Sequence, residues 1–172
     1  MEDYLQLVRA AKQGDTEAFA ALYGEIYENM YRFALYTLRN TADAEDVVSD
    51  AVMDAFASLH TLRSEEAFKS WCFKILANKC RDKLKESYRV TVQEAEEIAE
   101  IQTERPKSGL EEAAIVRGLF FELPADERLI IGMHLFCGYK SREIAEILHM
   151  NENTVRSKES RGLKKMAGKL KA

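Results

Sequence analysis

SREIAEILHMNENTVRSKESR, the stretch from residue 141 to residue 161, contains two amphipathic helical patterns separated by a short break. Ser141 can cap the first helix, and Asn151 or Asn153 can cap the second, because these side chains accept bonds from the free N–H groups of a first turn. The apolar positions that face inward are Ile144, Ala145, Leu148 and Val155. The spacing therefore predicts a helix, a turn at residues 149–151 and a second helix packed on the first.

The outward face of the second helix is rich in basic and hydroxyl side chains. These are Thr154, Arg156, Ser157, Lys158 and Arg161. A helix with such a face fits the DNA major groove, where Arg and Lys reach guanine acceptors and phosphates. The stretch predicts a helix-turn-helix unit that reads DNA, and a solvated surface helix is the alternative reading of the same residues.

Charge is divided into blocks along the chain, whose net charge is −4. Residues 63–89 carry 8 basic and 4 acidic residues, and residues 139–172 carry 9 and 4. Residues 1–62 carry 4 basic and 11 acidic residues, and residues 90–138 carry 4 and 10. Two local basic patches favour phosphate binding in spite of the negative total. The acidic blocks suit a basic partner, or they limit indiscriminate binding to DNA.

Composition and motifs exclude several classes of protein. No apolar run approaches the roughly 20 residues that span a bilayer, and the first residues do not read as a signal peptide, so we expect a cytoplasmic protein with no direct membrane insertion. Cys72, Cys80 and Cys137 lack paired spacing and are expected to be buried thiols. No metal-binding histidine motif, Gly-rich phosphate loop or serine elbow occurs, so we expect no enzyme, no metal and no cofactor.

Helical periodicity dominates the chain, with breaks at Gly14, at Asn40-Thr41 and at Leu123-Pro124. Thr41 is a candidate cap for the helix that follows it. We predict an all-α fold of two small helical domains joined by a flexible linker. The predicted parts are a first domain at residues 1–89, an acidic linker at 90–109, and a helix-turn-helix domain at 110–172.

The predicted helix at residues 42–59 has an apolar face and an acidic face. The apolar positions are Val48, Val52, Ala55, Phe56 and Leu59, and the aspartates are Asp43, Asp46, Asp50 and Asp54. Carboxylates three or four residues apart repel each other by a few tenths of a kcal/mol per pair. A basic partner surface would compensate that repulsion, whereas the alternative is a solvated face with no partner.

A further helix is predicted from about residue 65 to residue 85. Its apolar side includes Phe68, Trp71 and Ile75, which we expect to be core residues rather than a stacking platform for bases. Its other sides carry Asn78 and several basic residues.

Together these segments resemble a bacterial sigma factor of the extracytoplasmic-function (ECF) type, a group within the sigma-70 superfamily. Four pieces carry the resemblance, in the family's order: Gly14-Asp15-x-x-Ala18-Phe19-x-x-Leu22-Tyr23; Ala42-Asp43-Ala44-Glu45-Asp46-Val47-Val48 with Ala55-Phe56; Phe68-x-x-Trp71 with Ile75-x-x-Asn78; and Leu123-Pro124 followed by Gly138 to Leu148 and Thr154-Val155-Arg156-Ser157. Each piece alone is weak, but their joint order and spacing are specific.

The resemblance implies that the first domain binds the RNA polymerase core and opens the minus-ten promoter element. The acidic residues implied in docking on the largest polymerase subunit are Asp43, Glu45, Asp46, Asp50 and Asp54. The residues implied in minus-ten DNA contacts are Asn78, Lys79, Arg81 and Lys85. Residues 62–67 would form a pocket for an unstacked base, because opening DNA requires a place for the extruded base.

The second domain would read the minus-thirty-five element as a duplex. The residues implied in this contact are Lys140, Arg142, Thr154, Arg156, Ser157, Lys158 and Arg161. Residues 123–135 would also dock on the flap of the second-largest polymerase subunit. His149 stands where the family often has glycine in the turn, and histidine tolerates the left-handed backbone better than most residues.

The family implies an alternative sigma factor that directs core polymerase to specific promoters, assists promoter melting and does no bond chemistry itself. Members are usually held inactive by an anti-sigma protein, which is often anchored in the membrane. Two other classes stay open at this point. One is a self-sufficient repressor or activator that binds an operator without polymerase, and the other is a purely structural helical adaptor.

Overall fold

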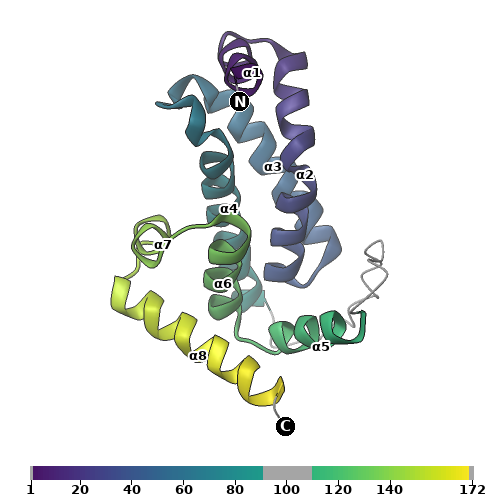
Figure 1. Cartoon of the computed structure of the whole chain (residues 1–172), viewed down its shortest axis with the longest axis vertical. Helices are drawn as coiled ribbons and strands as arrows, with labels where there is room; N and C mark the ends of the chain where they lie inside the picture. The colour runs from purple at the N-terminus through teal and green to yellow at the C-terminus, as the bar shows by residue number, and fades with distance from the viewer. Residues whose placement is uncertain (1, 91–109, 171–172) are drawn as a thin grey trace.

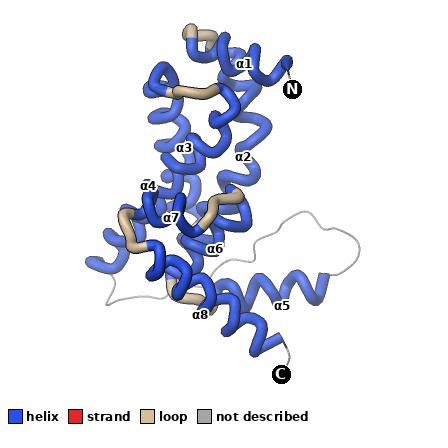
Figure 2. The backbone as a smooth tube through the Cα atoms, turned by 60° about the vertical axis from the view of Figure 1, so that its left-hand side comes forward, coloured by secondary structure: helices blue, strands red, loops and turns tan. Residues whose placement is uncertain are grey.

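The computed structural model describes residues 2–90 and 110–170, and all regular structure in these residues is helical (Figures 1 and 2). The α-helices are α1 Glu2–Lys12, α2 Thr16–Leu38, α3 Thr41–Ser58, α4 Phe68–Val90, α5 Leu110–Phe121, α6 Ala125–Cys137, α7 Ser141–Leu148 and α8 Glu152–Leu170. Two 3₁₀ turns, η1 Leu59–Thr61 and η2 Glu65–Ala67, separate α3 from α4. The predicted helical fold is confirmed, while residues 91–109 of the predicted linker lie outside the described residues.

Helices α2, α3 and α4 pack side by side, with α1 across one end (Figure 1). The long α2 buries an apolar stripe that includes Phe19, Leu22, Ile26 and Phe33. Its start is fixed by Asp15, whose Oδ1 accepts bonds from the N–H groups of residues 17 and 18, each at 3.0 Å. The three- and four-residue spacing of these apolar side chains places them on one face of α2, which is the face that the core covers.

Two predicted helix caps are wrong. Asn40, not Thr41, caps α3, because its Oδ1 accepts a bond of 2.9 Å from the N–H of Asp43. Ser141 is the first residue of α7 rather than its cap, and the N–H of Lys140 donates to Glu143 Oε2 at 2.8 Å. A capping side chain must precede the helix by one residue, and the residue pattern alone does not fix the first helical position.

The second half of the chain is built on α6, which α8 crosses at close range. Gly162 of α8 makes this crossing possible, since a Cβ at this position would lie 2.7 Å from Ile131 Cδ1 of α6. Val155 is fully buried, as predicted. His149 adopts the left-handed conformation at the end of α7, with φ 53° and ψ 45°, and Asn151 rather than Asn153 caps α8 through a bond of 2.8 Å to the N–H of Asn153.

The two halves share one hydrophobic core. Helix α6 packs against α2 and α4, and α7 packs against α4 (Figure 2). The same cluster of buried residues includes Phe33 and Phe73 of the first half and Ile130, Met133 and Ile144 of the second. In this structure the predicted domains are therefore packed against each other rather than held only by the chain that connects them.

Cys72 and Cys80 are buried in this core and Cys137 is half-buried, as expected of unpaired thiols. Burial raises the pKa of Cys72 and of Cys137 to about 12, because the thiolate would lose its hydration. In the unfolded chain a thiol ionises near pH 8.5, so the unfolded state gains free energy as pH rises while the folded thiol stays protonated.

We therefore expect the free energy of unfolding to fall as pH rises from about 8.5 towards 12, by about 1.4 kcal/mol per pH unit for each such thiol. Urea titrations at pH 8 and pH 10 measure this slope. In a Cys72→Ala variant the free energy of unfolding should fall less steeply with pH, by the contribution of one thiol. An unchanged slope in that variant would show that the burial of Cys72 does not cause this pH dependence.

Candidate functional site

The acidic face lies on α3, at the surface of the first half. Glu45, Asp46 and Asp50 are exposed. The other two predicted members are paired with lysines of the neighbouring helix: Asp43 Oδ1 lies 3.1 Å from Lys83 Nζ, and Asp54 Oδ2 lies 2.7 Å from Lys79 Nζ. The hydrogen bond and the charge of Asp43 raise the pKa of Lys83. Three of the five predicted carboxylates, Glu45, Asp46 and Asp50, thus lie exposed on α3 outside these two ion pairs.

Exposed apolar side chains lie on the same helix as these carboxylates. Met53 is 69% exposed and Phe56 is 41% exposed. Phe56 was predicted on the apolar face of this helix, and its ring does pack against Phe19, with the ring centroids 5.0 Å apart. Phe56 lies at the edge of the apolar face. Helical spacing alone does not distinguish a residue at this edge, which is partly exposed, from one that is fully buried. The acidic face is therefore bordered by apolar side chains, an arrangement that is typical of protein-binding surfaces.

A row of tyrosines runs along the outer side of α2. Tyr27 is exposed, and its ring contacts Tyr23 at 5.5 Å and Tyr31 at 6.2 Å between centroids. Burial, and next the negative charge of Glu45 on α3, raise the pKa of Tyr31. The row therefore lies close to the acidic face. Neither Tyr27 nor Tyr31 was predicted as a functional residue, although the four-residue spacing of the three tyrosines indicates one helix face.

The predicted minus-ten residues all lie on α4, but they differ in their contacts. Asn78 donates its amide N–H to Lys74 O on its own helix at 3.0 Å, and Lys79 is paired with Asp54. Arg81 is only 21% exposed and lies 3.3 Å from Asp82. Lys85 is exposed. The four residues share one helix, and two of them, Arg81 and Lys85, face the second half of the chain.

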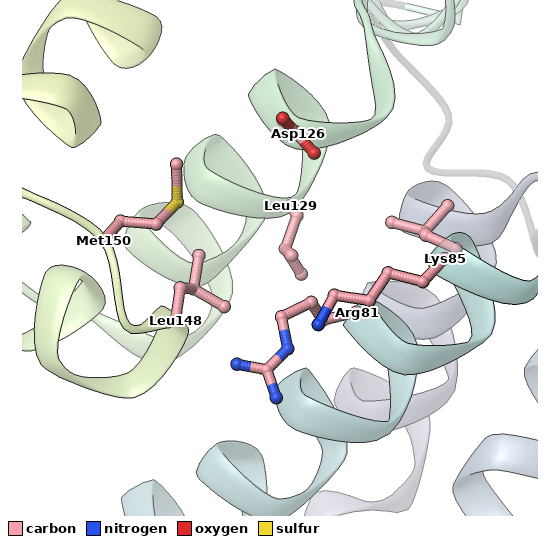
Figure 3. A pocket seen from close by; sticks show the side chains of 7 residues that line it. Arg81, Lys85, Asp126, Leu129, Leu148 and Met150 are labelled. Atoms are coloured by element: carbon pink, nitrogen blue, oxygen red, sulfur yellow. The ribbon is translucent and has the colours of Figure 1, made fainter. Parts of the chain in front are cut away.

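Arg81 and Lys85 line a small pocket between the two halves (Figure 3). The opposite wall is formed by Asp126 and Leu129 of α6 and by Leu148 and Met150 at the end of α7. Part of the predicted minus-ten face is therefore covered by the predicted minus-thirty-five domain.

The segment predicted to form a base pocket, residues 62–67, follows η1, includes η2 and is bonded to α1. Lys12 Nζ donates to Leu62 O at 2.8 Å and lies 3.5 Å from Glu65 Oε1. Leu62 is buried, whereas Arg63 is exposed. Lys12 was not predicted as a functional residue, because its partners are 50 and 53 positions away and no local pattern connects them.

The predicted minus-thirty-five residues form two groups in the structure. Lys140, Arg142, Thr154, Arg156 and Ser157 are exposed. Arg156 pairs with Glu152 on its own helix, at 2.6 Å. Lys158 and Arg161 instead reach α6, where Lys158 Nζ lies 2.9 Å from Asp126 Oδ2 and Arg161 Nε lies 3.6 Å from Glu127 Oε1. The first group is thus exposed to solvent, whereas the second group joins α8 to α6.

Glu127 is buried, and its Oε2 has no hydrogen-bond partner within the described part of the chain. The oxygen lies 3.4 Å from the position that a Cβ of Gly162 would take. Arg161 thus supplies the positive charge that faces a buried carboxylate. In residues 2–90 and 110–170, no group of three His, Cys, Asp or Glu side chains is placed to hold a metal ion. No helix among these residues is long and apolar enough to cross a membrane.

The described residues form a two-part helical fold whose second part contains a helix-turn-helix unit, α7 and α8. Two family models match the chain: sigma-70 region 2 at residues 22–90 and sigma-70 region 4 at residues 116–166. The chain is 33% identical over 139 residues to the RNA polymerase sigma factor SigV of Bacillus subtilis, with 81% of this chain and 82% of SigV covered. It is 26% identical over 162 residues to the ECF sigma factor SigM of Mycobacterium tuberculosis, with 94% of this chain and 82% of SigM covered.

The chain belongs to the sigma-70 family of RNA polymerase sigma factors, in the ECF group.

Solved structures show the same fold. The sigma factor RpoE of Bartonella quintana, determined with the anti-sigma factor NepR, matches with a TM-score of 0.71 and 22% identity over 91% of this chain and 99% of that one. CnrH, determined with the cytosolic domain of CnrY, matches with a TM-score of 0.64 and 24% identity over 98% of this chain and 97% of that one. Both matches extend over both halves of this chain.

Proposed function

We propose that this sigma factor binds the RNA polymerase core through the acidic face of α3, opens the minus-ten element with α4 and the segment at residues 62–67, and reads the minus-thirty-five element with α8. The observation that carries the proposal is the separation of three surfaces on one chain. The α3 face is acidic with an apolar border, the α4 face is basic, and the α8 face is basic and lies in a helix-turn-helix unit.

The acidic face suits a basic helical surface of the largest polymerase subunit. Glu45, Asp46 and Asp50 would supply charge complementarity, and Met53 and Phe56 would supply the apolar area at its border. Residues 123–135 would dock on the flap of the second-largest subunit. Much of that segment is buried inside this chain, with Leu135 as its most exposed apolar residue at 65%. We therefore place flap contact at the end of α6.

DNA contact would be divided between the two halves. Arg156, Ser157 and Thr154 face solvent on the first turns of α8, where a recognition helix meets base edges. Lys140 and Arg142 lie before and at the start of α7 and would hold phosphates. Asn78, Lys79, Arg81 and Lys85 would hold the opened minus-ten strand along α4.

In vitro transcription with purified core polymerase and a library of promoter fragments tests the function. We expect specific initiation only when both the chain and the core are present. Weak binding of free chain to DNA is expected in the same assay conditions. Tight operator binding without core would favour the repressor alternative, and a complete lack of promoter-specific initiation would overturn the proposal.

Lys12→Met is expected to lower the rate of promoter opening about tenfold while leaving core affinity unchanged. The substitution removes a charged donor from a backbone carbonyl, a bond worth about 1.5–3 kcal/mol at full strength and less at a partly exposed site. Stopped-flow fluorescence of 2-aminopurine in the minus-ten strand measures the opening. Lys12→Arg should retain most of the rate, and Lys69→Met, an exposed lysine on α4, serves as the control. Equal loss in the control would show a general charge effect.

We also propose that an anti-sigma protein controls this chain in the cytoplasm, held at the membrane if that inhibitor is anchored there. The two solved relatives were each determined with a protein partner, the anti-sigma factor NepR in one and the cytosolic domain of CnrY in the other. Purification of the chain from its native host before and after stress tests this idea. Recovery without any stoichiometric inhibitory partner in all conditions would remove its support.

A further inference from the structure

A pocket of about 200 Å³ lies where α4 faces α6 and α7, and it combines an apolar lining with two cations (Figure 3). Its apolar side chains are Leu84, Leu129, Leu148 and Met150. The cations are Arg81 and Lys85, whose side chains extend from α4 towards Leu129 of the opposite wall. The pocket is more enclosed than the shallow grooves along α8 and beside α1. An enclosed apolar lining with a few charged groups is typical of a small-molecule site.

The charged side chains that line this pocket, taken with their ion-pair partners, have an excess of positive charge. Arg81 Nε lies 3.3 Å and Lys85 Nζ lies 3.7 Å from the same oxygen, Oδ1 of Asp82. On the opposite wall Asp126 is already paired, since its Oδ2 lies 2.9 Å from Lys158 Nζ. Three cations and two carboxylates therefore leave a net charge of +1, which favours an anionic ligand.

The guanidinium of Arg81 is placed to bind a second carboxylate. It meets Asp82 through Nε, so the edge formed by its two Nη atoms can receive another carboxylate in a bidentate arrangement. Only 21% of the Arg81 side chain is exposed, and a charge-assisted bond is stronger at such a site than in open water. Arg81 therefore supplies the main anion contact, and the more exposed Lys85 supplies the second charge.

Hydrogen bonds between the two halves hold the walls of the pocket in place. Arg128 of α6 donates from Nε and Nη2 to Thr37 O near the end of α2, at 3.2 and 3.1 Å. Tyr139, before α7, donates to Ser70 O of α4. A ligand that enters a preformed pocket does not have to order its walls, so less of the binding free energy is lost.

We propose that this pocket binds a small apolar organic acid. The carboxylate of the acid would lie at Arg81 and Lys85, and its apolar body would cover the side chains of α6 and α7 on the opposite wall. An apolar cavity of about 150 Å³ holds a benzene ring, so a pocket of about 200 Å³ admits a body of roughly six to eight carbon atoms.

The bound acid would compete with DNA for two cations. Arg81 and Lys85 are also among the residues proposed to hold the minus-ten strand, and a carboxylate at these side chains would exclude a phosphate from them. This competition rests on the proposed function of α4, whereas the binding of the acid does not.

Isothermal titration calorimetry of the full chain with butanoate, hexanoate and octanoate is the first measurement. Affinity should rise up to about fourfold with each added methylene until the pocket is full, because each methylene leaves water. 1-Hexanol and hexylamine have the same apolar body without the negative charge, and each should bind at least about tenfold more weakly than hexanoate. Equal binding of hexanoate and 1-hexanol, or no binding of any of the three acids at millimolar concentration, would overturn the proposal.

Two variants locate the binding in this pocket. Met150→Trp should fill it and lower the affinity for octanoate at least about tenfold, whereas Leu163→Trp, at an exposed apolar position of α8 outside the pocket, is the matched control. Arg81→Met should remove most of the preference for hexanoate over 1-hexanol, and Lys69→Met, at an exposed position of the same helix, should retain it. Circular dichroism establishes that each variant keeps its helix content. Unchanged octanoate binding in Met150→Trp and Arg81→Met would place the acid elsewhere and overturn the assignment.

Competition with a fluorescent single-stranded oligonucleotide is the second measurement. Saturating octanoate should lower the affinity of the chain for the oligonucleotide about tenfold in the wild type, and by much less in Met150→Trp, which does not bind the acid. If octanoate binds with the expected dependence on chain length and charge but leaves the affinity for the oligonucleotide unchanged, the acid site stands and the role of Arg81 and Lys85 in holding DNA is wrong.

Discussion

Replacement of Asp46 and Asp50 by lysine is expected to lower the affinity for core polymerase at least about 100-fold, equivalent to about 2.7 kcal/mol. Both carboxylates are exposed on α3 and neither takes part in the lysine pairs that Asp43 and Asp54 form with α4. The change therefore converts attraction into repulsion at the proposed interface while leaving the Asp43–Lys83 and Asp54–Lys79 pairs in place. Fluorescence anisotropy of labelled chain titrated with core measures the affinity.

Asp3→Lys combined with Glu17→Lys is the matched control, since it makes the same change in net charge at exposed positions near the opposite end of α2. We expect less than a threefold effect from the control pair when ionic strength is near physiological, because charges farther than about 8 Å from the interface are screened. Unchanged core affinity in the Asp46 and Asp50 variant would exclude the acidic face as the main docking surface.

Arg161→Met is expected to lower the free energy of unfolding by about 2 kcal/mol, although Arg161 lies on the proposed DNA-reading helix. The guanidinium is the cation that faces Glu127, a buried carboxylate of α6, at 3.6 Å. Its removal leaves a buried charge without compensation, and the exposure of Arg161 keeps the cost below that of a fully buried pair. Urea unfolding followed by circular dichroism measures the change.

Glu127→Gln in the Arg161→Met background should restore at least half of the lost stability, because the amide carries no charge. Arg156→Met is the companion control, since its partner Glu152 lies on the same exposed helix face and the pair contributes only a few tenths of a kcal/mol. If both arginine variants are equally stable and differ from the wild type only in DNA affinity, the structural role of Arg161 is wrong.

The helical elements were predictable because local patterns specify them. Helix α2 is specified by the helical spacing of Phe19, Leu22, Ile26 and Phe33. The helix-turn-helix unit is specified by Ile144, Ala145 and Leu148 together with Val155. The left-handed His149 was also predictable, since the turn demands that conformation and histidine tolerates it. The first residues of the helices were harder to predict. Asn40 and Thr41 both have capping side chains, and only packing decides which one precedes the first helical residue.

Contacts between distant residues escaped prediction. The spacing on α8 placed Lys158 and Arg161 beside Arg156, but it could not show that they reach Asp126 and Glu127 on α6. The predicted acidic stripe did not reveal that lysines of α4 already neutralise Asp43 and Asp54. Composition likewise indicated a tether between two domains, while the shared core arises from tertiary packing that periodicity does not encode.

Arg128 of α6, Arg39 after α2 and Tyr139 before α7 donate four hydrogen bonds between the two halves, and all four end on main-chain oxygens of Thr37, Phe121 and Ser70. Every residue provides such an oxygen, so the acceptors persist whatever side chains stand at positions 37, 70 and 121. Sequence change can therefore adjust the attachment of the halves through the donors and through the packing of the shared core, in which a Cβ at Gly132 would lie 3.1 Å from Phe33. Related chains could therefore share one helical framework and still differ widely in how strongly their two halves are attached. A few donor positions would set the strength of that attachment.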